Sequence, residues 1–353
     1  MPGWRQSDPE LALKAFRRSC VVFAHNWTAA PQWRPACERA VAVDAGSARA
    51  FFEHYFTPVQ QGPDGGPGGL LTAYYEPQIE VRTNPVPGFE APIYARPADL
   101  VTVEPKRFGA DGLHMRKIMG RVVAGRLAPY FSRQEILRHG GKALAWGRPA
   151  DVFFLQIQGS GRLHFGDGHI VRAAFAGHNG LPYTSIGKIL IDTGELAPGK
   201  ASKGAIEQWL RDAGPQKAAQ LMNRNRRYVF FRAQSISDPN RGPRGTQGAP
   251  LTARASLAVD PLQIPLGSPV WVQTRLPAHE RDWRGVPAQF LAIAQDTGGA
   301  ITGKVRGDLF LGAGGAAGRE AGMIKHKARL WVLKPKPGMT PAISGALAST
   351  PPS

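Results

Sequence analysis

Two aspartates near the C-terminal end of the sequence could carry acid and base chemistry. Asp296 closely follows the apolar run 290–294, and Asp308 lies 12 residues further on, after a glycine-rich turn. A carboxyl group held at the end of a buried strand has its pKa raised by desolvation, which suits it to donate a proton near neutral pH. This is the chemistry that cleaves glycosidic bonds.

The Asp-Thr-Gly-Gly sequence that begins at Asp296 also has a purely structural interpretation. An Asp side chain accepts hydrogen bonds from its own turn, and Gly supplies the positive φ angles that a turn needs. Taken alone, such residues are more often turn formers than catalysts. The rest of the sequence must therefore decide between the two interpretations.

The elements that must position these aspartates are strands separated by Gly/Pro turns. Residues 250–335 contain four strand candidates, with a short helical segment after Asp308. The candidates are 251–259, 269–274, 290–294 and 328–333. High Gly and Pro contents, 42 and 31 residues, likewise favour many turns between short strands. We expect a mainly β fold.

The N-terminal region differs, because it predicts helices. Apolar residues recur at steps of three or four over 13–27, and Ser7 with Glu10 matches a capping box. Further helices are expected after Ala36 and from Ser47, and a glycine-rich loop follows.

The middle of the chain predicts strands first and then a helical group. Strands are expected at 70–82, 152–165, 169–177 and 228–232, and helices are expected to start near Ser132, Thr184, Ser202 and Pro215. The Gly-Asp-Gly sequence between His164 and His169 favours a hairpin turn over a metal site.

The formal net charge of +18 is concentrated in one part of the chain. Residues 96–232 hold 22 basic and 10 acidic residues, a net of +12. Such a field attracts polyanions, whether nucleic acid, anionic lipid or bacterial wall strands. A genome that favours Arg would give the same composition without any polyanionic partner, so charge alone selects none.

Two cysteines, Cys20 and Cys37, are the only ones in the sequence. They could form one disulfide in an oxidising compartment, and two buried thiols are an equally simple alternative. The first seven residues lack the pattern of a signal peptide, and no apolar run is long enough for a membrane helix. Either the protein is cytoplasmic or an export segment lies upstream of the assigned start.

Two nucleotide-binding motifs can be set aside. Residues 312–317 match a loose G-x-G-x-x-A pattern, but no acidic residue follows Glu320 to hold a ribose. A phosphate-binding G-x-x-x-x-G-K-[ST] loop is absent from the sequence.

Four segments, taken in order, resemble the membrane-bound lytic murein transglycosylase A family, whose members cleave peptidoglycan glycan strands. They are Thr72-Ala73-Tyr74-Tyr75-Glu76-Pro77, Gln156-Ile157-Gln158-Gly159-Ser160-Gly161, Phe175-Ala176-Gly177-His178-Asn179-Gly180, and a module similar to the "3D" domain with Asp260, Asp296 and Asp308. Each is short, but their common order across residues 70–335 is specific.

The resemblance implies a double-psi β-barrel interrupted by an inserted domain. It predicts an N-terminal helical region at 1–69, a barrel from 70–95 plus 233–335, and a smaller β-rich insert at 96–232 that forms one side of the substrate groove. Residues 336–353 are expected to be a disordered tail. The basic excess then falls in the insert, where it would face an acidic wall strand.

The resemblance also implies a reaction and its residues. A lytic transglycosylase cleaves the β-1,4 bond between N-acetylmuramic acid and N-acetylglucosamine, and it needs one carboxyl group because the C6 hydroxyl of the substrate attacks. Asp308 would be the acid and base, and Asp296 its support. Substrate-binding residues would be Thr72, Tyr74, Tyr75, Gln156, Gln158, Ser160 and Asp260, with Asp260 also holding the turn before Pro261.

If the strand around Tyr74 and Tyr75 alternates, one of the two rings lies in the core and only the other can stack on sugar. We expect no metal and no cofactor. The expected partners are peptidoglycan strands, with wall-synthesis proteins as further candidates, no nucleic acid, and a monomeric chain. The resemblance implies a periplasmic, outer-membrane-associated location.

Two alternatives remain open from the sequence. One is a protein that binds wall glycan or another polyanion without cutting it. The other is a glycoside hydrolase that uses both Asp296 and Asp308.

Overall fold

The computed structural model describes residues 1–62, 68–108, 117–239 and 241–338. The chain divides into two compact units. The first comprises Met1–Thr72, Arg244–Phe310 and His326–Ser353, and the second comprises Ala73–Pro243 and Leu311–Lys325. Most of the predicted tail 336–353, like the middle of the predicted loop before residue 70, lies outside the described residues.

Helices are short and form two groups along the chain, α1 to α3 and α4 to α8, with α9 alone near the C-terminal end. The α-helices are α1 (Glu10–Ala24), α2 (Arg34–Ala40), α3 (Ala48–Tyr55), α4 (Arg133–His139), α5 (Pro149–Gln158), α6 (Ile186–Asp192), α7 (Lys203–Asp212), α8 (Gly214–Arg224) and α9 (Gly314–Met323). Single 3-10 turns are η1 (Trp4–Gln6), η2 (Pro31–Trp33), η3 (Ala45–Ser47) and η4 (Pro105–Phe108).

Strands make up most of the remaining regular structure, so the expected mainly β fold is confirmed. They are β1 (Phe56–Gln60), β2 (Gly69–Glu76), β3 (Gln78–Arg82), β4 (Ala91–Tyr94), β5 (Val101–Val103), β6 (Ile118–Val123), β7 (Arg126–Pro129), β8 (Ala143–Gly147), β9 (Gly161–Phe165), β10 (Ile170–His178), β11 (Val229–Ser235), β12 (Ser256–Val259), β13 (Pro269–Leu276), β14 (Val286–Asp296), β15 (Arg306–Ala313) and β16 (Lys325–Pro335).

A seven-stranded sheet organises the first unit. Its order is β1-β16-β13-β14-β12-β15-β2, and a further pairing of β16 with β2 closes six of the strands into a ring. Most neighbours are antiparallel, whereas β12 and β14 run parallel. The sheet is therefore barrel-like, as expected, while its double-psi connectivity stays a prediction.

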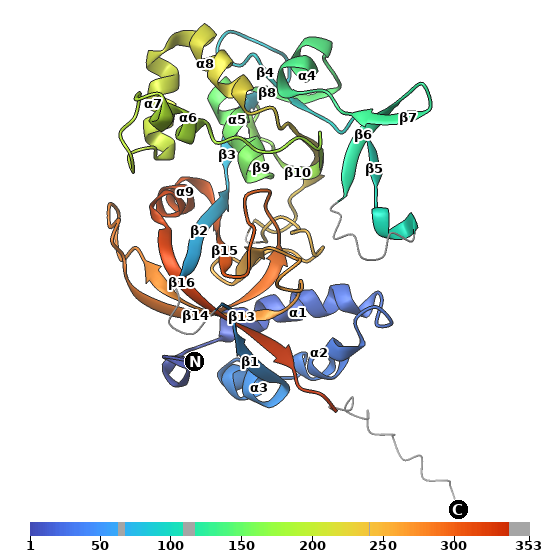
Figure 1. The fold of residues 1–353 in the computed structure, drawn as a ribbon, viewed down its shortest axis with the longest axis vertical. Coiled ribbons are helices and arrows are strands. Elements are labelled where there is room, and N and C mark those ends of the chain that lie inside the picture. The colour runs from blue at the N-terminus through green and yellow to red at the C-terminus, as the bar shows by residue number, and fades with distance from the viewer. Residues whose placement is uncertain (63–67, 109–116, 240, 339–353) are drawn as a thin grey trace, which may run out of the picture. The chain divides into compact units, whose positions relative to one another are not determined.

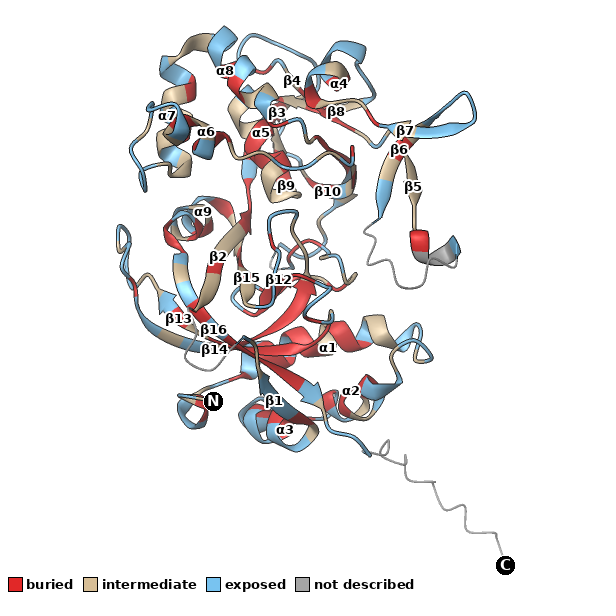
Figure 2. Ribbon diagram, viewed as in Figure 1, coloured by how far each residue is buried: buried red, intermediate tan, exposed pale blue. Residues whose placement is uncertain are grey.

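The three N-terminal helices cover this sheet on the side of β14 (Figure 1). Phe16 of α1 is fully buried and packs against the rings of Phe52 in α3 and Phe56 in β1. The same core includes Trp271 and Ile293 from the sheet. Figure 2 shows α1 and the sheet beside it with much of their ribbon coloured as buried. A disulfide between Cys20 and Cys37 joins α1 to α2, which decides between the two alternatives for these cysteines.

The second unit is built around a six-stranded sheet in the order β11-β10-β9-β3-β8-β4. An isolated parallel bridge between Ala95 and Phe231 links the two ends of this sheet. Helices α5 to α8 share a separate apolar core, and β5, β6 and β7 form a small antiparallel sheet. Strands β3 and β4, which were expected to belong to the barrel, are members of the six-stranded sheet. The boundaries between the two units therefore differ from the predicted boundaries at 95/96 and 232/233.

Glu76 of the first motif has a structural role in the second unit. Its carboxylate is fully buried and accepts hydrogen bonds from Arg162 at 3.0 Å and Arg172 at 2.5 Å. The two guanidinium groups also donate to the carbonyls of Pro239 and Arg241. One buried carboxylate thereby ties three segments together, and an unpaired charge at this depth would be costly.

Two local predictions were wrong. The strand expected at 152–165 is α5 followed by β9, because a continuous apolar run does not distinguish helix from strand, and Pro149 begins the helix while Gly159 (φ 81°) ends it. The capping box of Ser7 and Glu10 is absent, since Pro9 is the N-cap of α1 and the Ser7 hydroxyl donates to the Trp4 carbonyl.

Other local predictions are confirmed. Ser132 and Glu135 form the capping box of α4, and the side chain of Ser202 caps α7. The predicted hairpin connects β9 to β10. Among the described residues, no helix has the length and apolarity to cross a membrane.

Candidate active site

Asp296 and Asp308 flank the same residue of a central strand. In the pairing of β12 with β15, Asp308 lies opposite Ala258, and in the pairing of β12 with β14, Asp296 lies opposite Ala258 as well. Residues opposite one another in a sheet point to the same face. The two carboxylates therefore share one face of the sheet, two strand spacings apart, which is roughly 10 Å between Cα atoms.

Thr72 and Arg306 surround the carboxyl group of Asp308. The Thr72 hydroxyl donates a hydrogen bond to Asp308 Oδ1, and Arg306 Nη2 donates to the Thr72 hydroxyl oxygen at 2.8 Å. Because the Thr72 oxygen accepts the hydrogen bond from Arg306, the Thr72 hydroxyl is left to donate its own hydrogen to the carboxylate. The result is an ordered chain from guanidinium to hydroxyl to carboxyl.

The pKa of Asp308 is raised to about 6. Desolvation is the largest cause, and the nearby charge of Asp296 also raises the pKa of Asp308, while the Thr72 hydrogen bond and the Arg306 charge lower it. Asp308 keeps part of its surface exposed to solvent, so a substrate can reach it. It is nevertheless surrounded by enough protein atoms to lose most of its hydration. Such a carboxyl group can act as acid and as base near neutral pH.

Asp296 is held in a different way. Its Oδ1 accepts hydrogen bonds from the backbone amide and the hydroxyl of Thr246, both at 2.9 Å, and from the amide of Thr297 at 2.9 Å. These donors favour the ionised form of a carboxylate. Asp296 thus holds three hydrogen bonds on Oδ1 and faces the same side of the sheet as Asp308.

Asp260, the third aspartate, lies at the end of β12 and is buried. Its carboxylate accepts from the amide of Leu262 at 3.1 Å and from that of Gly303 at 2.8 Å. It was expected to hold the turn before Pro261; its bond to Leu262 holds the turn from Pro261 onward, and its bond to Gly303 ties that turn to the loop before β15. Asp260 therefore contacts the backbone that precedes β15, the strand that carries Asp308.

The tyrosines of the first motif lie in the second unit and alternate as a strand requires. Tyr75 is 8% exposed and its pKa is raised by burial, whereas Tyr74 is half-buried. The ring of Tyr75 lies against Gly318 of α9, where any side chain would collide with it. Tyr75 is thus the ring in the core, and Tyr74 is the one left for other contacts.

The residues of the second motif, Gln156, Gln158 and Ser160, also lie in the second unit, and their side chains are placed differently. Gln158 accepts a hydrogen bond from the Tyr75 amide at 3.2 Å through its side-chain oxygen, and Ser160 lies in the turn from α5 to β9. Gln156 is buried on α5 and lines a cavity of this unit. The predicted site residues therefore form two groups, with Thr72, Asp260, Asp296 and Asp308 in the first unit and the others in the second.

Sequence reasoning missed Arg306 and Thr246. Arg306 lies two residues before Asp308 on the same strand, so the period of two places both on one face, and that signal was available. Thr246 lies 50 residues before Asp296 in an irregular segment, and no periodicity points to it.

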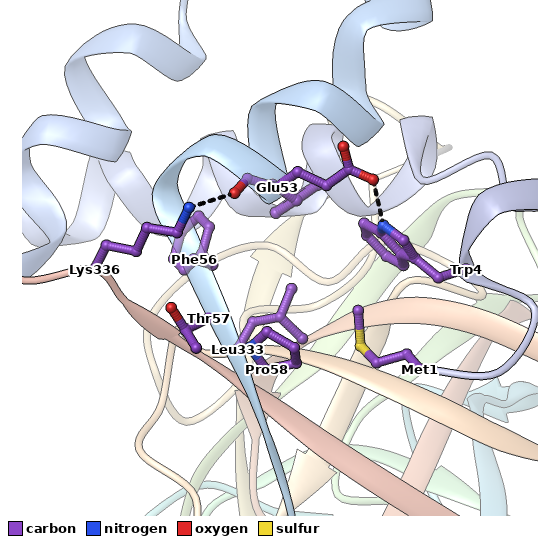
Figure 3. Close-up of a pocket in the computed structure, with 9 residues that line it drawn as sticks. Met1, Trp4, Glu53, Phe56, Thr57, Pro58, Leu333 and Lys336 are labelled. Atoms are coloured by element: carbon purple, nitrogen blue, oxygen red, sulfur yellow. Dashed lines mark hydrogen bonds between the residues drawn. The ribbon is translucent and has the colours of Figure 1, made fainter.

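A cavity of the first unit contains none of the predicted site residues (Figure 3). It measures about 390 Å³ and lies between the start of the chain, α3 and β16. There the Trp4 indole donates to the Glu53 carboxylate and Lys336 donates to the Glu53 carbonyl, both at 2.8 Å. Within the described part of the chain, no group of three or more His, Cys, Asp or Glu side chains is placed to hold a metal ion.

Known families match both parts of the chain. Residues 70–232 match the MltA specific insert domain and residues 255–334 match the 3D domain. "Membrane-bound lytic murein transglycosylase A" of Escherichia coli K12 is 34% identical over 286 residues, which are 81% of this chain and 71% of that protein. The protein of the same name from Vibrio cholerae is 32% identical over 75% of this chain and 65% of its own length.

Solved structures are similar over almost the whole chain. The membrane-bound lytic murein transglycosylase from Agrobacterium tumefaciens has a TM-score of 0.80 at 33% identity and covers 95% of both chains. MltA from Neisseria gonorrhoeae, in its monoclinic form, has a TM-score of 0.78 at 32% identity, over 97% of this chain and 91% of that one. E. coli MltA with bound chitohexaose has a TM-score of 0.68 at 29% identity, over 92% and 88%.

Proposed function

The chain belongs to the membrane-bound lytic murein transglycosylase A family, and we propose that Asp308 is the acid and base of its reaction. The protein is a lytic transglycosylase that acts on peptidoglycan. One observation carries the assignment of Asp308: it is a desolvated carboxyl group, reachable from solvent, whose pKa is raised to about 6.

The proposed reaction cleaves the β-1,4 bond between N-acetylmuramic acid and N-acetylglucosamine. Protonated Asp308 gives its proton to the glycosidic oxygen as the bond to C1 of the muramic acid breaks. The C6 hydroxyl of the same sugar then attacks C1, and its proton passes to the Asp308 carboxylate. A 1,6-anhydromuramoyl end forms, the leaving strand carries a free hydroxyl, and Asp308 is protonated again.

Thr72 and Arg306 support this cycle by holding the carboxylate form. After the first proton transfer Asp308 is negative, and it then gains from the Thr72 hydrogen bond and the nearby guanidinium. Without them, desolvation would raise the pKa of Asp308 further and make it a weaker acid toward the glycosidic oxygen. We assign both as positioning residues.

Asp296 is assigned as an electrostatic support and not as a second catalyst. Its Cα atom lies roughly 10 Å from that of Asp308, across β12, and its charge raises the pKa of Asp308. Thr246 and Thr297 also occupy Oδ1 of Asp296, which favours a permanent negative charge over proton transfer.

The remaining predicted residues are proposed to serve the substrate in different ways. Tyr74 is the ring proposed to stack on sugar, and Gln158 and Ser160 are proposed as polar contacts. Gln156 stays a proposed substrate contact, from the cavity of the second unit that it lines. Tyr75 and Asp260 act indirectly, since Tyr75 packs on α9 and Asp260 holds the loop before Asp308. Interaction with wall-synthesis proteins and a monomeric state stay predictions.

The proposed location is the periplasm, in association with the outer membrane. The relatives are named membrane-bound, and the Cys20–Cys37 disulfide suits an oxidising compartment. Fractionation of cells followed by mass spectrometry of the mature N-terminus tests this location, and recovery of the chain with reduced thiols in the cytosol would refute it.

An isotope experiment separates the transglycosylase from the two-carboxylate hydrolase. Bacterial sacculi are digested in H2¹⁸O, and the masses of the soluble muropeptides are measured by mass spectrometry. Intramolecular attack gives anhydro ends without ¹⁸O, whereas hydrolysis gives reducing ends that carry ¹⁸O. Retention on sacculi with no soluble product of either kind would support the non-catalytic binding protein.

A further inference from the structure

The second unit contains a cavity that the proposed reaction does not use. Helices α4, α5 and α8 and strands β4 and β8 enclose about 360 Å³, within the range of small-molecule sites. All of its lining residues belong to the second unit, and neither Asp296 nor Asp308 is among them.

Gln156 gives this cavity an unused hydrogen-bond acceptor. The residue is 5% exposed, and its side-chain Oε1 has no hydrogen-bond partner in the described structure. The side chain of Gln156 is also hydrogen bonded to the Tyr228 hydroxyl, which limits its rotation. A buried polar atom without a partner is costly, so a ligand that donates an N–H or O–H to it would gain that energy.

Arg133 brings a buried positive charge to the same cavity. Its guanidinium donates to the carbonyls of Asn225 at 2.9 Å and Arg227 at 2.7 Å, and it stacks over the rings of Phe153 and Tyr228. Desolvation and the Tyr228 hydroxyl, and no carboxylate, act on its charge among the described residues. Burial lowers the pKa of Arg133 to about 10, so the group stays charged at neutral pH.

The walls between these two groups are mainly apolar. Trp146 of β8, Leu137 of α4 and Met222 of α8 contribute side chains of intermediate or greater exposure. Glu90 also lines the cavity, and it is exposed, with its carboxylate bound by the Gly88 amide at 2.6 Å. The cavity thus combines a buried cation, a buried acceptor, apolar surface and an anion open to solvent.

We propose that this cavity binds the carboxylate end of a peptide stem of peptidoglycan. Such a stem ends in D-alanyl residues, which offer a free carboxylate to Arg133, an amide N–H to Gln156 and methyl groups to the apolar walls. The ammonium group of its diamino acid complements Glu90. The inference rests on the proposed function for the identity of the polymer, and it adds a peptide site to a glycan-cleaving enzyme.

The test measures binding of a soluble peptide that contains no glycosidic bond. Nα-acetyl-L-Lys-D-Ala-D-Ala is titrated into the full chain by calorimetry, beside the same peptide with a C-terminal amide and the peptide ending in L-Ala-L-Ala. We expect saturable binding of the acid, and the amide should bind about tenfold more weakly or worse, because a charge-assisted contact is lost.

Two matched substitutions on α8 locate the site. Ala219 lines the cavity and is exposed, so Ala219→Trp fills the space without disturbing the core and should abolish peptide binding. Gln220, its exposed neighbour outside the cavity, is the control, and Gln220→Trp should bind as the unaltered protein does. Gln156→Leu should weaken binding, with thermal unfolding measured to show that the fold is kept.

Three results would overturn the proposal: no saturable binding, equal binding of acid and amide, or unchanged binding by Ala219→Trp. Tighter binding of the L-Ala-L-Ala peptide would also overturn it, since the site would then suit the C-terminus of a protein. Cleavage of sacculi is measured separately, so a failure of peptide binding and a failure of the transglycosylase assignment are distinguishable.

Discussion

The hydroxyl of Thr72 donates a hydrogen bond to the carboxyl group of Asp308, although the two residues lie 236 positions apart in the sequence. The bond joins β2, the second strand of the chain, to β15, the last but one, and the two strands are neighbours in the closed sheet. It also opposes desolvation in setting the pKa of Asp308. The closed sheet therefore places the Thr72 hydroxyl against Asp308 and so lowers the pKa that desolvation raises.

Thr72→Val should move the pH dependence of cleavage to higher pH. The hydrogen bond favours ionised Asp308, so its loss raises the pKa of Asp308, by roughly one unit for a bond to a charged group. The alkaline limb of kcat/KM on glycan strands reports this pKa. Thr72→Ser keeps a hydroxyl and is the control; an unchanged limb in Thr72→Val would refute the assignment of Thr72.

Asp296→Asn should move the same limb in the opposite direction. The negative charge of Asp296 raises the pKa of Asp308, so removing it lowers that pKa, by less than the Thr72 shift because the Asp296 effect is the smallest of the four causes. Asn can still accept the Thr246 and Thr297 hydrogen bonds through its amide oxygen. Loss of nearly all activity at every pH would instead make Asp296 a second catalytic carboxylate.

Asp308→Asn should stabilise the fold at neutral pH. The folded pKa of about 6 exceeds the unfolded value of about 3.9, so the native state binds more protons and the protein loses stability as pH rises through that window. Above this window the buried carboxylate lowers the free energy of unfolding by roughly 1 to 3 kcal/mol, and an uncharged Asn avoids that loss. Denaturant unfolding at pH 7.5 should show the gain, and the two proteins should converge near pH 4.

Asp282→Asn provides the matched comparison for that stability measurement. Backbone amides of Ala278 and Gly285 hold the pKa of Asp282 below its usual value. Its ionised form is therefore favoured by the fold, and its removal should not stabilise the protein at neutral pH. Equal gains from both substitutions would point to a general charge effect instead of the desolvation of Asp308.

Much of this site could be predicted from the sequence because its signals are local. The apolar run before Asp296, the turn after it and the alternation of Tyr74 and Tyr75 follow from backbone geometry and side-chain chemistry. The family resemblance supplied the distinct role of Asp308, which no spacing contains. The resulting assignments of Asp308 and its support remain predictions until they are measured.

Other features depend on contacts that no local pattern encodes. The chain of Arg306, Thr72 and Asp308 forms only when β2 pairs beside β15, and the arginines around Glu76 come from β9 and β10. The helix α5 was missed because burial on all sides removes the periodicity that distinguishes helix from strand. Long-range pairing and burial therefore mark the limit of the sequence prediction.

Removing the disulfide should destabilise the N-terminal helices without changing the chemistry of Asp308. Cys20→Ala with Cys37→Ala releases a loop of 17 residues between α1 and α2, and such a loss costs about 3 kcal/mol in the chain-entropy account. The melting temperature should fall, and the unaltered protein should fall similarly under reducing conditions. If a reductant lowered the melting temperature of the double variant as much as that of the unaltered protein, the effect of the reductant would not come from this disulfide.

The most direct test of the central claim is the product released from sacculi by Asp308→Asn. The unaltered protein should release 1,6-anhydromuropeptides, and Asp308→Asn should release none, while its unfolding curve shows a fold at least as stable as the original. Release of anhydro products by Asp308→Asn at a rate near that of the unaltered protein would contradict the claim that Asp308 is the acid and base.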